Sequence, residues 1–388
     1  MLMKTKKEPI GIERIAAVHF FLHDLNRTCD HYVNVLDFQE VAVSTPAFEI
    51  EHHARASVVE AGDVRFVLFE ATEPRGETHQ WLQRHPEGVG RVVFDVTDAE
   101  RAFALLTERG ATPVSGIQRR VVEGGLVSWF DIATAFGDTL FRFVQHEGRT
   151  PIMPNLQRLD TTGHVSNRFG ITHIDHVTTN FLTMQPALAW MEQVMGFERF
   201  WNIDFHTQDV DRGNVHGSGL KSIVMHDPYS GLKFANNEPA QPNFHSSQIY
   251  LFYVDHRGAG IQHLALGVTD LIGAVNGMRE RGGQFMPTPK TYYDMLPERL
   301  REIGVNHLEE ELDVLRDMQI LVDGQADRSY LLQIFMKEAS GIFHDAEAGP
   351  VFIELLQRKG DLGFGGGNFR ALFESIERQQ QVEGRVPA

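Results

Sequence analysis

Two histidines and one glutamate have the residue types and positions expected of a metal site. His176, His263 and Glu354 each lie within a short apolar run typical of a β-strand. In the chain, 87 residues separate the first from the second and 91 separate the second from the third. This spacing suits ligands on three strands of one curved sheet rather than a helical HExxH zinc motif. Two imidazoles and one carboxylate leave adjacent coordination positions open, the usual arrangement of non-haem iron(II) in oxygen chemistry.

Each of these residues also has an ordinary structural interpretation. A single histidine in a strand is more often a hydrogen-bonded core residue, and Glu354 could pair with an arginine or lie at the rim of a sheet. Without such a partner, a carboxylate in the apolar run 351–356 is costly to bury. His173 is an alternative to His176 on the opposite face of the same strand. Strict alternation along a strand predicts that His176 shares a face with Ile174 and Thr178, His263 with Ile261 and Ala265, and Glu354 with Phe352 and Leu356.

An internal repeat indicates how these strands are arranged. Residues 11–38 parallel residues 170–197, residues 88–110 parallel residues 260–282, and residues 140–148 parallel residues 352–360. The basic unit is a strand, a helix and further strands, and each half of the chain contains two such units. In the second pair, a strand runs into Val-Thr-Asp before the helix. Possible helix N-caps there are Thr97 or Asp98, and Thr269 or Asp270.

Overlaying the two halves shows that the candidate ligands are missing from the first half as a set. His176 aligns with Ala17, His263 with Arg91, and Glu354 with Arg142. A metal site in one half and a scaffold in the other explains this joint absence. We expect an N-terminal domain without metal ligands over residues 1–150, a linker over 151–169 and a catalytic domain over 170–388.

Composition narrows the class of protein. The 388-residue chain has a net charge of −16, which argues against a nucleic-acid partner. It has one cysteine, Cys29, so no internal disulfide and no cysteine-based metal site can form. No apolar run reaches about 18 residues, and the start of the chain lacks the features of a signal peptide. These features predict a protein with no membrane span, located in a reducing cytoplasm.

A series of motifs in the second half resembles the catalytic domain of the 4-hydroxyphenylpyruvate dioxygenase family. The first half resembles that family more weakly, mainly through the repeat. The motifs occur in order, and as a set they are highly specific. They are NRFG running into IDH (167–176), NEP (237–239), SQI (247–249), GIQH (260–263), PTP with YYDML (287–296), LLQIF (331–335), ELLQRKG (354–360) and GFGGGNF (363–369).

The resemblance implies a fold, a cofactor and a reaction. The fold is α+β, the vicinal oxygen chelate fold, in which paired βαβββ modules form two open barrel-like domains, here with a C-terminal helix. The ligands would be His176, His263 and Glu354, the metal Fe(2+), and no further catalytic residue is implied. The partners would be an α-keto acid and O2, giving homogentisate and CO2 in tyrosine catabolism. Family members are commonly dimers or tetramers, so we expect a homo-oligomer.

The resemblance also implies a set of substrate contacts and a closing helix. Asn368 could cap a helix in which Phe369, Leu372, Phe373 and Ile376 have helical spacing. That helix would pack on the core, close over the iron as a lid, or both. The implied substrate-binding residues are Ser222, Asn237, Gln248, Gln262, Gln333, Phe335, Phe352, Phe364, Phe369 and Phe373.

Three other functions remain open from the sequence. The first is 4-hydroxymandelate synthase, which uses the same substrate and metal but hydroxylates the benzylic carbon. Phe335 favours attack on the ring, because the synthase tends to carry a smaller residue there. The second is another metal enzyme of this fold, such as an extradiol dioxygenase that cleaves a catechol. The third is a binding protein without metal, against which the intact set of three ligands argues.

Overall fold

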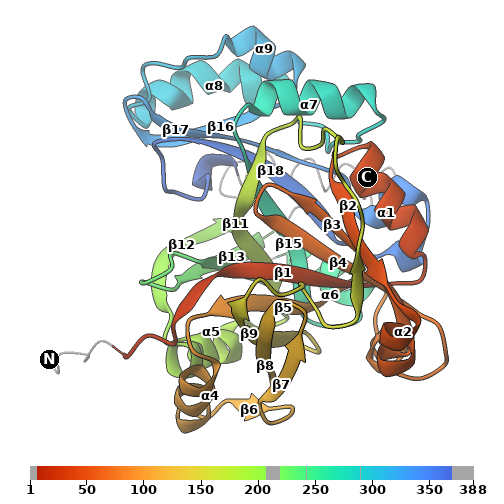
Figure 1. The fold of residues 1–388 in the computed structure, drawn as a ribbon. Helices are drawn as coiled ribbons and strands as arrows, with labels where there is room; N and C mark the ends of the chain where they lie inside the picture. The colour runs from red at the N-terminus through yellow and green to blue at the C-terminus, as the bar shows by residue number, and fades with distance from the viewer. Residues whose placement is uncertain (1–6, 207–218, 242, 289, 369–388) are drawn as a thin grey trace, which may run out of the picture.

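The fold consists of two curled β-sheets, one from each half of the chain, with helices at their edges (Figure 1). The structure, a computed structural model, describes residues 7–206, 219–241, 243–288 and 290–368. Ten strands form the first sheet and eight form the second. No described helix combines the length and the apolar character that a membrane crossing requires.

The first half contains all ten strands of the first sheet, including one strand from the segment expected to be a linker. That strand, β10, pairs with β2 in the antiparallel sense. The elements of this half are β1 (Ile12–Leu22), α1 (Leu25–Asn34), β2 (Gln39–Ser44), α2 (Pro46–His52), β3 (Ala54–Ala61), β4 (Val64–Ala71), α3 (Glu77–Leu82), β5 (Gly88–Val96), α4 (Ala99–Glu108), β6 (Thr112–Pro113), β7 (Gln118–Val122), β8 (Gly125–Ala133), β9 (Leu140–Gly148) and β10 (Leu156–Arg158).

The second half repeats this plan and adds helices, of which α8 and α9 lie together at the top of Figure 1. Its elements are β11 (Ile171–Asn180), α5 (Gln185–Trp190) with the π-helix η1 (Met191–Met195), β12 (Glu198–His206), β13 (Gly219–His226), β14 (Lys233–Pro239), α6 (Gln248–Asp255), β15 (Gly260–Val268), α7 (Leu271–Glu280), α8 (Lys290–Glu302), α9 (Leu312–Asp317), β16 (Leu321–Ala326), β17 (Ser329–Phe335), α10 (Ala339–Phe343), the 3-10 helix η3 (Ala346–Ala348) and β18 (Phe352–Lys359).

Strand order confirms the internal repeat. The first sheet runs β2-β3-β4-β1-β5-β9-β8 and the second runs β12-β13-β14-β11-β15-β18-β17. In both halves the central pair is antiparallel and is flanked by parallel pairs, which are β1 with β4, β5 with β9, β11 with β14 and β15 with β18. The expected N-caps are also present: the carboxylates of Asp98 and Asp270 accept from backbone N–H groups at the start of α4 and α7. This arrangement matches the predicted α+β fold of paired βαβββ modules.

The strand registers confirm the overlay of the two halves residue by residue. Ala17 pairs with Val93 and His176 pairs with Ala265 at the same place in the two central strand pairs. Val93 in turn pairs with Arg142, and Ala265 with Glu354. The two triplets Ala17, Arg91, Arg142 and His176, His263, Glu354 therefore occupy equivalent positions in the two sheets.

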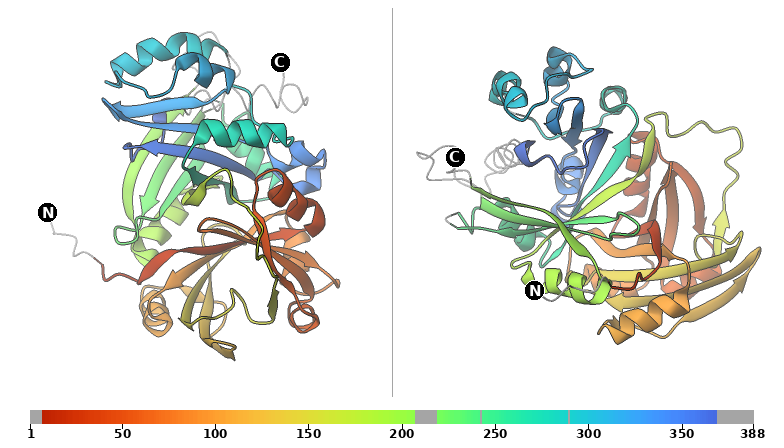
Figure 2. Two further views of the ribbon diagram at one scale, coloured as in Figure 1. Left: turned by 45° about the horizontal axis from the view of Figure 1, so that its top comes forward. Right: turned by 90° about the vertical axis from the view of Figure 1, so that its left-hand side faces the viewer.

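One hydrophobic core joins the two halves. It includes buried residues of both sheets, among them Val18 and Phe94 from the first and Val177 and Phe234 from the second. The Phe234 ring is stacked on Phe136 at 6.0 Å and 7° between planes. Figure 2 shows from two further sides that the curled sheets lie against each other. The shared core holds the second sheet in a fixed relation to the first and leaves its curled face for the site.

Two β-bulges break the strict alternation expected around the ligands. Ile174 pairs with Leu266 and His176 with Ala265, so Asp175 is an extra residue on β11; Gln262 is likewise extra on β15. A bulge brings two consecutive side chains to one face of a strand. The prediction that His176 shares a face with Ile174, and His263 with Ile261, was therefore wrong, because both isoleucines lie in the shared core.

Candidate metal centre

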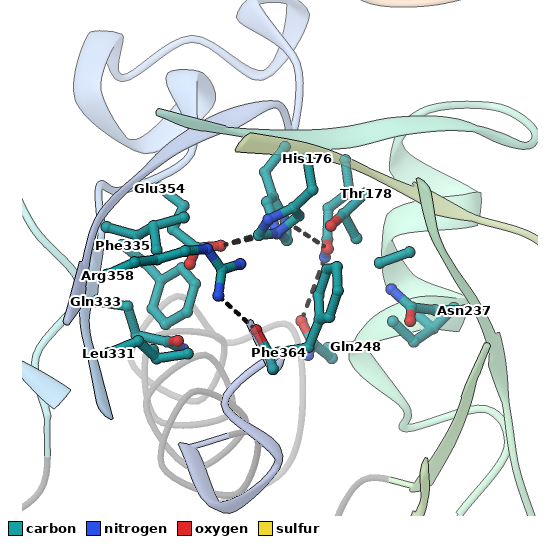
Figure 3. Close-up of a pocket in the computed structure, with 16 residues that line it drawn as sticks. His176, Thr178, Asn237, Gln248, Leu331, Gln333, Phe335, Glu354, Arg358 and Phe364 are labelled. Atoms are coloured by element: carbon teal, nitrogen blue, oxygen red, sulfur yellow. Dashed lines mark hydrogen bonds and ion pairs between the residues drawn. The ribbon is translucent and has the colours of Figure 1, made fainter. Parts of the chain in front are cut away.

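The structure brings the three predicted ligands together on adjacent strands of the second sheet. One possible ligand atom from each of His176, His263 and Glu354 lies within 4.8 Å of the other two. Figure 3 labels His176 and Glu354 at this site. Oε2 of Glu354 lies 3.5 Å from Nε2 of His176 and 3.2 Å from Nε2 of His263. His173, the alternative on β11, has a side chain that is 58% exposed and lies outside this group. The geometry therefore selects His176.

Both imidazoles are oriented by the bulge residue that precedes them. Nδ1 of His176 lies 3.0 Å from Oδ1 of Asp175, and Nδ1 of His263 lies 3.2 Å from Oε1 of Gln262. These contacts leave Nε2 of each ring directed at Glu354. Metal-bound histidines usually donate their second N–H to such a partner, which sets the tautomer and the ring orientation. The two partners differ in charge, since one is a carboxylate and the other a neutral amide.

Arg358 connects the orienting carboxylate to the chain segment that follows β18. Its Nε and Nη2 each donate to Asp175 at 2.7 Å, and its Nη1 donates to the carbonyls of Asp361 and Gly363. The next residue, Phe364, places its ring 4.9 Å from that of His176. One half-buried guanidinium thus holds both the carboxylate that orients His176 and the loop that carries Phe364 into the pocket lining.

The electrostatics of the three side chains suit a cation. Burial would raise the pKa of Glu354, but the two neighbouring imidazoles lower it to about 2, so the carboxylate is ionised at neutral pH. Burial lowers the pKa of His263. Among the described residues, Glu354 has no lysine or arginine within ion-pair distance. A buried carboxylate with two imidazole nitrogens and no other cationic partner matches the donor set that a divalent transition metal prefers.

A pocket with an empty volume of about 570 Å³ extends from these ligands. Oδ1 of Asn237 is buried without a hydrogen-bond partner among the residues described, so it can accept a hydrogen bond from a ligand. All three predicted ligands, His176, His263 and Glu354, line this pocket. Six of the predicted substrate-binding residues line it as well, namely Asn237, Gln248, Gln262, Gln333, Phe335 and Phe364.

Four predicted substrate residues lie elsewhere or outside the described residues. Ser222 is fully buried on β13, paired with Asn237 across the strands but not at the pocket surface. Phe352 lies behind the ligands, with its ring stacked on that of His263 at 4.8 Å and 24°. Phe369 and Phe373, and with them the expected C-terminal helix, lie outside the described residues. Asn368 is not the N-cap that we expected, because residues 366–368 are already helical and its Oδ1 accepts from Tyr292.

Three further residues at the site were not singled out from the sequence. Asp175, Arg358 and Thr178 lie at the ligands or line the pocket. The signal for Asp175 and Arg358 was present, since charged residues in apolar strands need partners. Their pairing could not be read from the chain because they are 183 residues apart.

Comparison with known proteins identifies the family in two steps. A family model described as the Glyoxalase/Bleomycin resistance protein/Dioxygenase superfamily matches residues 14–137 and 173–296. One match falls in each half, in agreement with the repeat. The chain belongs to this superfamily.

Individual relatives narrow the assignment. The 4-hydroxyphenylpyruvate dioxygenase of Coccidioides posadasii is 33% identical over 95% of this chain and 93% of its own length. That of Dictyostelium discoideum is 31% identical over 95% of this chain and 98% of its own. A mutant of 4-hydroxymandelate synthase from Streptomyces coelicolor superimposes with a TM-score of 0.79 at 25% identity, covering 95% of this chain and 99% of its own. The chain is a member of the 4-hydroxyphenylpyruvate dioxygenase family.

Proposed function

We propose that this chain is a 4-hydroxyphenylpyruvate dioxygenase, which converts 4-hydroxyphenylpyruvate and O2 to homogentisate and CO2. Curated relatives with this activity match almost the whole chain. The observation that supports this assignment at the level of the site is the buried group of His176, His263 and Glu354 in the lining of a pocket.

For the cofactor, we propose iron(II) held by these three side chains. The support is the donor set of two imidazoles and one carboxylate. When bound, the metal would act as a template that binds the keto acid and activates O2 beside it. Asp175 and Gln262 would keep the Nε2 atoms of the two histidines directed at the metal.

The pocket walls would orient the substrate and exclude water. Phe335 and Phe364 line opposite parts of the pocket and provide apolar surface for the substrate ring (Figure 3). The unpartnered Oδ1 of Asn237 would accept a hydrogen bond from the phenol, with Gln248 and Gln333 as further polar neighbours. Such fixed contacts aim the ring and the side chain of the substrate in one orientation.

The test is reconstitution with iron(II) under anaerobic conditions, followed by oxygen uptake with 4-hydroxyphenylpyruvate and product analysis by NMR and mass spectrometry. We expect one O2 consumed and one CO2 released per homogentisate formed. The matched control is Glu354→Gln, which keeps the shape of the side chain but removes its charge and should neither load iron nor consume O2. No oxygen uptake by the iron-loaded wild-type chain would reject the proposal.

The second candidate function is 4-hydroxymandelate synthase, favoured by the structural likeness to a mutant of that enzyme. Phe335 supports the dioxygenase, because it lines the pocket and its ring lies 6.2 Å from that of His263. The same product analysis separates the two, since the synthase gives hydroxymandelate. An extradiol dioxygenase would instead consume a catechol without releasing CO2.

We also propose that the chain forms a homo-oligomer and acts in the cytoplasm. The first proposal rests on the resemblance to the family, and the second on the single buried cysteine, Cys29, which suits a reducing compartment. Analytical ultracentrifugation measures the mass of the protein in solution and would test the oligomer. A mass of 43.9 kDa, that of a single chain, would reject it.

A further inference from the structure

The first half retains a cavity at the place equivalent to the metal site. Its empty volume is about 600 Å³, against about 570 Å³ for the pocket of the second half. The strand registers relate the two linings position by position. Ala17 corresponds to His176, His19 to Thr178, Trp129 to Gln333, Arg142 to Glu354 and His146 to Arg358.

The deep end of this cavity is the part lined by the buried His19 and the half-buried Arg142. Arg142 there joins a charge network with Arg91 and Asp131, which are buried beside the cavity. Asp131 accepts from Nε and Nη2 of Arg142, both at 2.8 Å, and its Oδ1 lies 3.2 Å from Nε of Arg91. Arg91 also pairs with Glu77, whose side chain is 47% exposed and therefore screened by water. Because only one of the two carboxylates is buried, the deep end has an excess of positive charge.

Two hydrogen-bond donors at the cavity have no partner among the described residues. One is Nη1 of Arg142, the nitrogen that does not contact Asp131. The other is Nε2 of His19, a side chain only 1% exposed that lines the cavity. Its Nδ1 lies 3.4 Å from Nη1 of Arg91, which can only donate, so the proton of the neutral ring is on Nε2.

The charge state of His19 agrees with this assignment. Burial lowers its pKa well below the ordinary value, and Arg91, Arg142 and His52 lower it further. The ring is therefore a neutral donor in a positive electrostatic environment. An anion beside it would be stabilised by the guanidiniums and would accept from both free donors.

The remaining walls are mainly apolar, and the charged groups nearer the mouth are paired. Val93, Val127, Val144 and the half-buried Trp129 form the wall around the deep end. At the mouth, Arg120 makes a two-point ion pair with Glu51, and Arg65 pairs with Glu60. Among the histidines there, His146 contacts Thr150 and lies 3.9 Å from Asp95, while burial lowers the pKa of His52. The lining thus offers one anion-binding subsite and, next to it, an apolar surface.

We propose that the cavity of the first half binds a small monocarboxylate with an aromatic or aliphatic body, without a metal. The carboxylate accepts hydrogen bonds from Nε2 of His19 and Nη1 of Arg142, and the body lies against Trp129 and the valines. This site occupies the position in the first sheet that is equivalent to the metal site in the second sheet. Its deep end is positively charged because Arg142 stands where the second half has Glu354.

Isothermal titration calorimetry of the full chain with phenylacetate tests this proposal. We expect a binding event that survives in His263→Ala, which disables the metal site, and that weakens at least tenfold in Ala17→Leu, which fills the cavity. His19→Leu removes one donor and should also weaken binding at least tenfold. Circular dichroism and thermal melting confirm that each variant is folded.

A measurement on the wild-type chain keeps the test independent of variant folding. Hydrogen exchange should show that phenylacetate protects amides of β1 and β9. Protection confined to β11 and β18, binding that is lost in His263→Ala, or binding unchanged in both Ala17→Leu and His19→Leu would overturn the proposal. So would the absence of binding at millimolar phenylacetate.

Discussion

The two halves of this chain share their strand order, their parallel and antiparallel pairs and even their bulges, but they differ in the residues at the three proposed ligand positions and at the two bulges. The bulges at Asp175 and Gln262 recur in the first half at Ala16 and Gly90. At Gly90 a side chain has no room, since an added Cβ would lie 2.2 Å from the Phe21 ring. The first half thus lacks both the ligands and the residues that orient them.

This difference shows that the fold provides the place and the side chains provide the chemistry. The bulges are not a response to the metal, because they are present where no ligand set exists. In the second half they present a proposed ligand and its orienting partner on one face of the strand. In the first half the same geometry presents Ala16 and Ala17, which line a cavity beside the network of guanidiniums around Asp131.

The largest expected effect is the loss of metal binding when a proposed ligand of the second half is removed. In Glu354→Ala, the Nε2 atoms of the two imidazoles face no carboxylate, so we expect metal content and oxygen uptake to fall below detection. The matched variant at the equivalent position, Arg142→Ala, should retain one metal per folded chain. The measurement is metal content after anaerobic loading and desalting. A stoichiometric metal in Glu354→Ala would contradict the assignment of the ligands.

The second largest effect should be a loss of folding stability caused by a substitution in the first half. Asp131→Asn removes the buried carboxylate that Arg91 and Arg142 share and leaves Arg91 only the exposed Glu77, which should cost about 3 to 5 kcal/mol in the free energy of unfolding. The control Asp95→Asn breaks a pair with Arg14, whose side chain is half exposed, and should cost about 1 kcal/mol or less. Urea unfolding measures both. Equal losses would show that the network around Asp131 is not what stabilises this half.

The same variant has a pH dependence of known sign. Despite burial, Arg91 and Arg142 lower the pKa of Asp131 below its ordinary value of 3.8. A lowered folded-state pKa gives stability that is fully present above the unfolded-state value and is lost as pH falls through the folded-state value. The difference between wild type and Asp131→Asn should therefore be constant above about pH 5 and shrink below about pH 4. A difference that grows on acidification would contradict this.

An intermediate effect is expected at Arg358, which acts on the metal through Asp175. Arg358→Met removes both hydrogen bonds to Asp175 and those to the loop before Phe364, and should weaken metal affinity about 10- to 100-fold. Cobalt(II) titration followed by its absorption bands measures affinity and geometry without turnover. The equivalent substitution in the first half, His146→Leu, should leave the cobalt spectrum unchanged. An unperturbed spectrum in Arg358→Met would limit the role of Arg358 to the loop.

The smallest effect should distinguish the two orienting residues. Gln262→Met removes a neutral partner of His263 and should weaken cobalt binding by about tenfold or less, whereas Asp175→Asn removes a charged partner and belongs in the upper part of the 10- to 100-fold range. The same titration ranks them. A greater loss in Gln262→Met would mean that the neutral contact at 3.2 Å matters more than the charged contact at 3.0 Å.

Much of the fold could be predicted because its signals are local or repeated. Patterns along the chain predict the helix N-caps Asp98 and Asp270 and the repeat that relates the two halves. The same repeat predicts that Ala17, Arg91 and Arg142 occupy positions equivalent to those of the proposed ligands. Alternation failed around His176 and His263 because a bulge depends on cross-strand pairing, which no single strand encodes. Likewise, Asn368 was expected to cap a helix, but its Oδ1 accepts a hydrogen bond from the hydroxyl of Tyr292 in α8, which is far away in the sequence.

By itself, the sequence determined the family and the two-part architecture, and it narrowed the proposed ligands to His263, Glu354 and either His173 or His176, because residue types at repeated strand positions are visible in the chain. The tertiary structure alone decided the choice of His176 over His173, the roles of Asp175, Gln262 and Arg358, and the cavity of the first half. These depend on side chains from distant strands meeting in space. Such contacts arise from register and curvature, which form only when the sheets close around a common core.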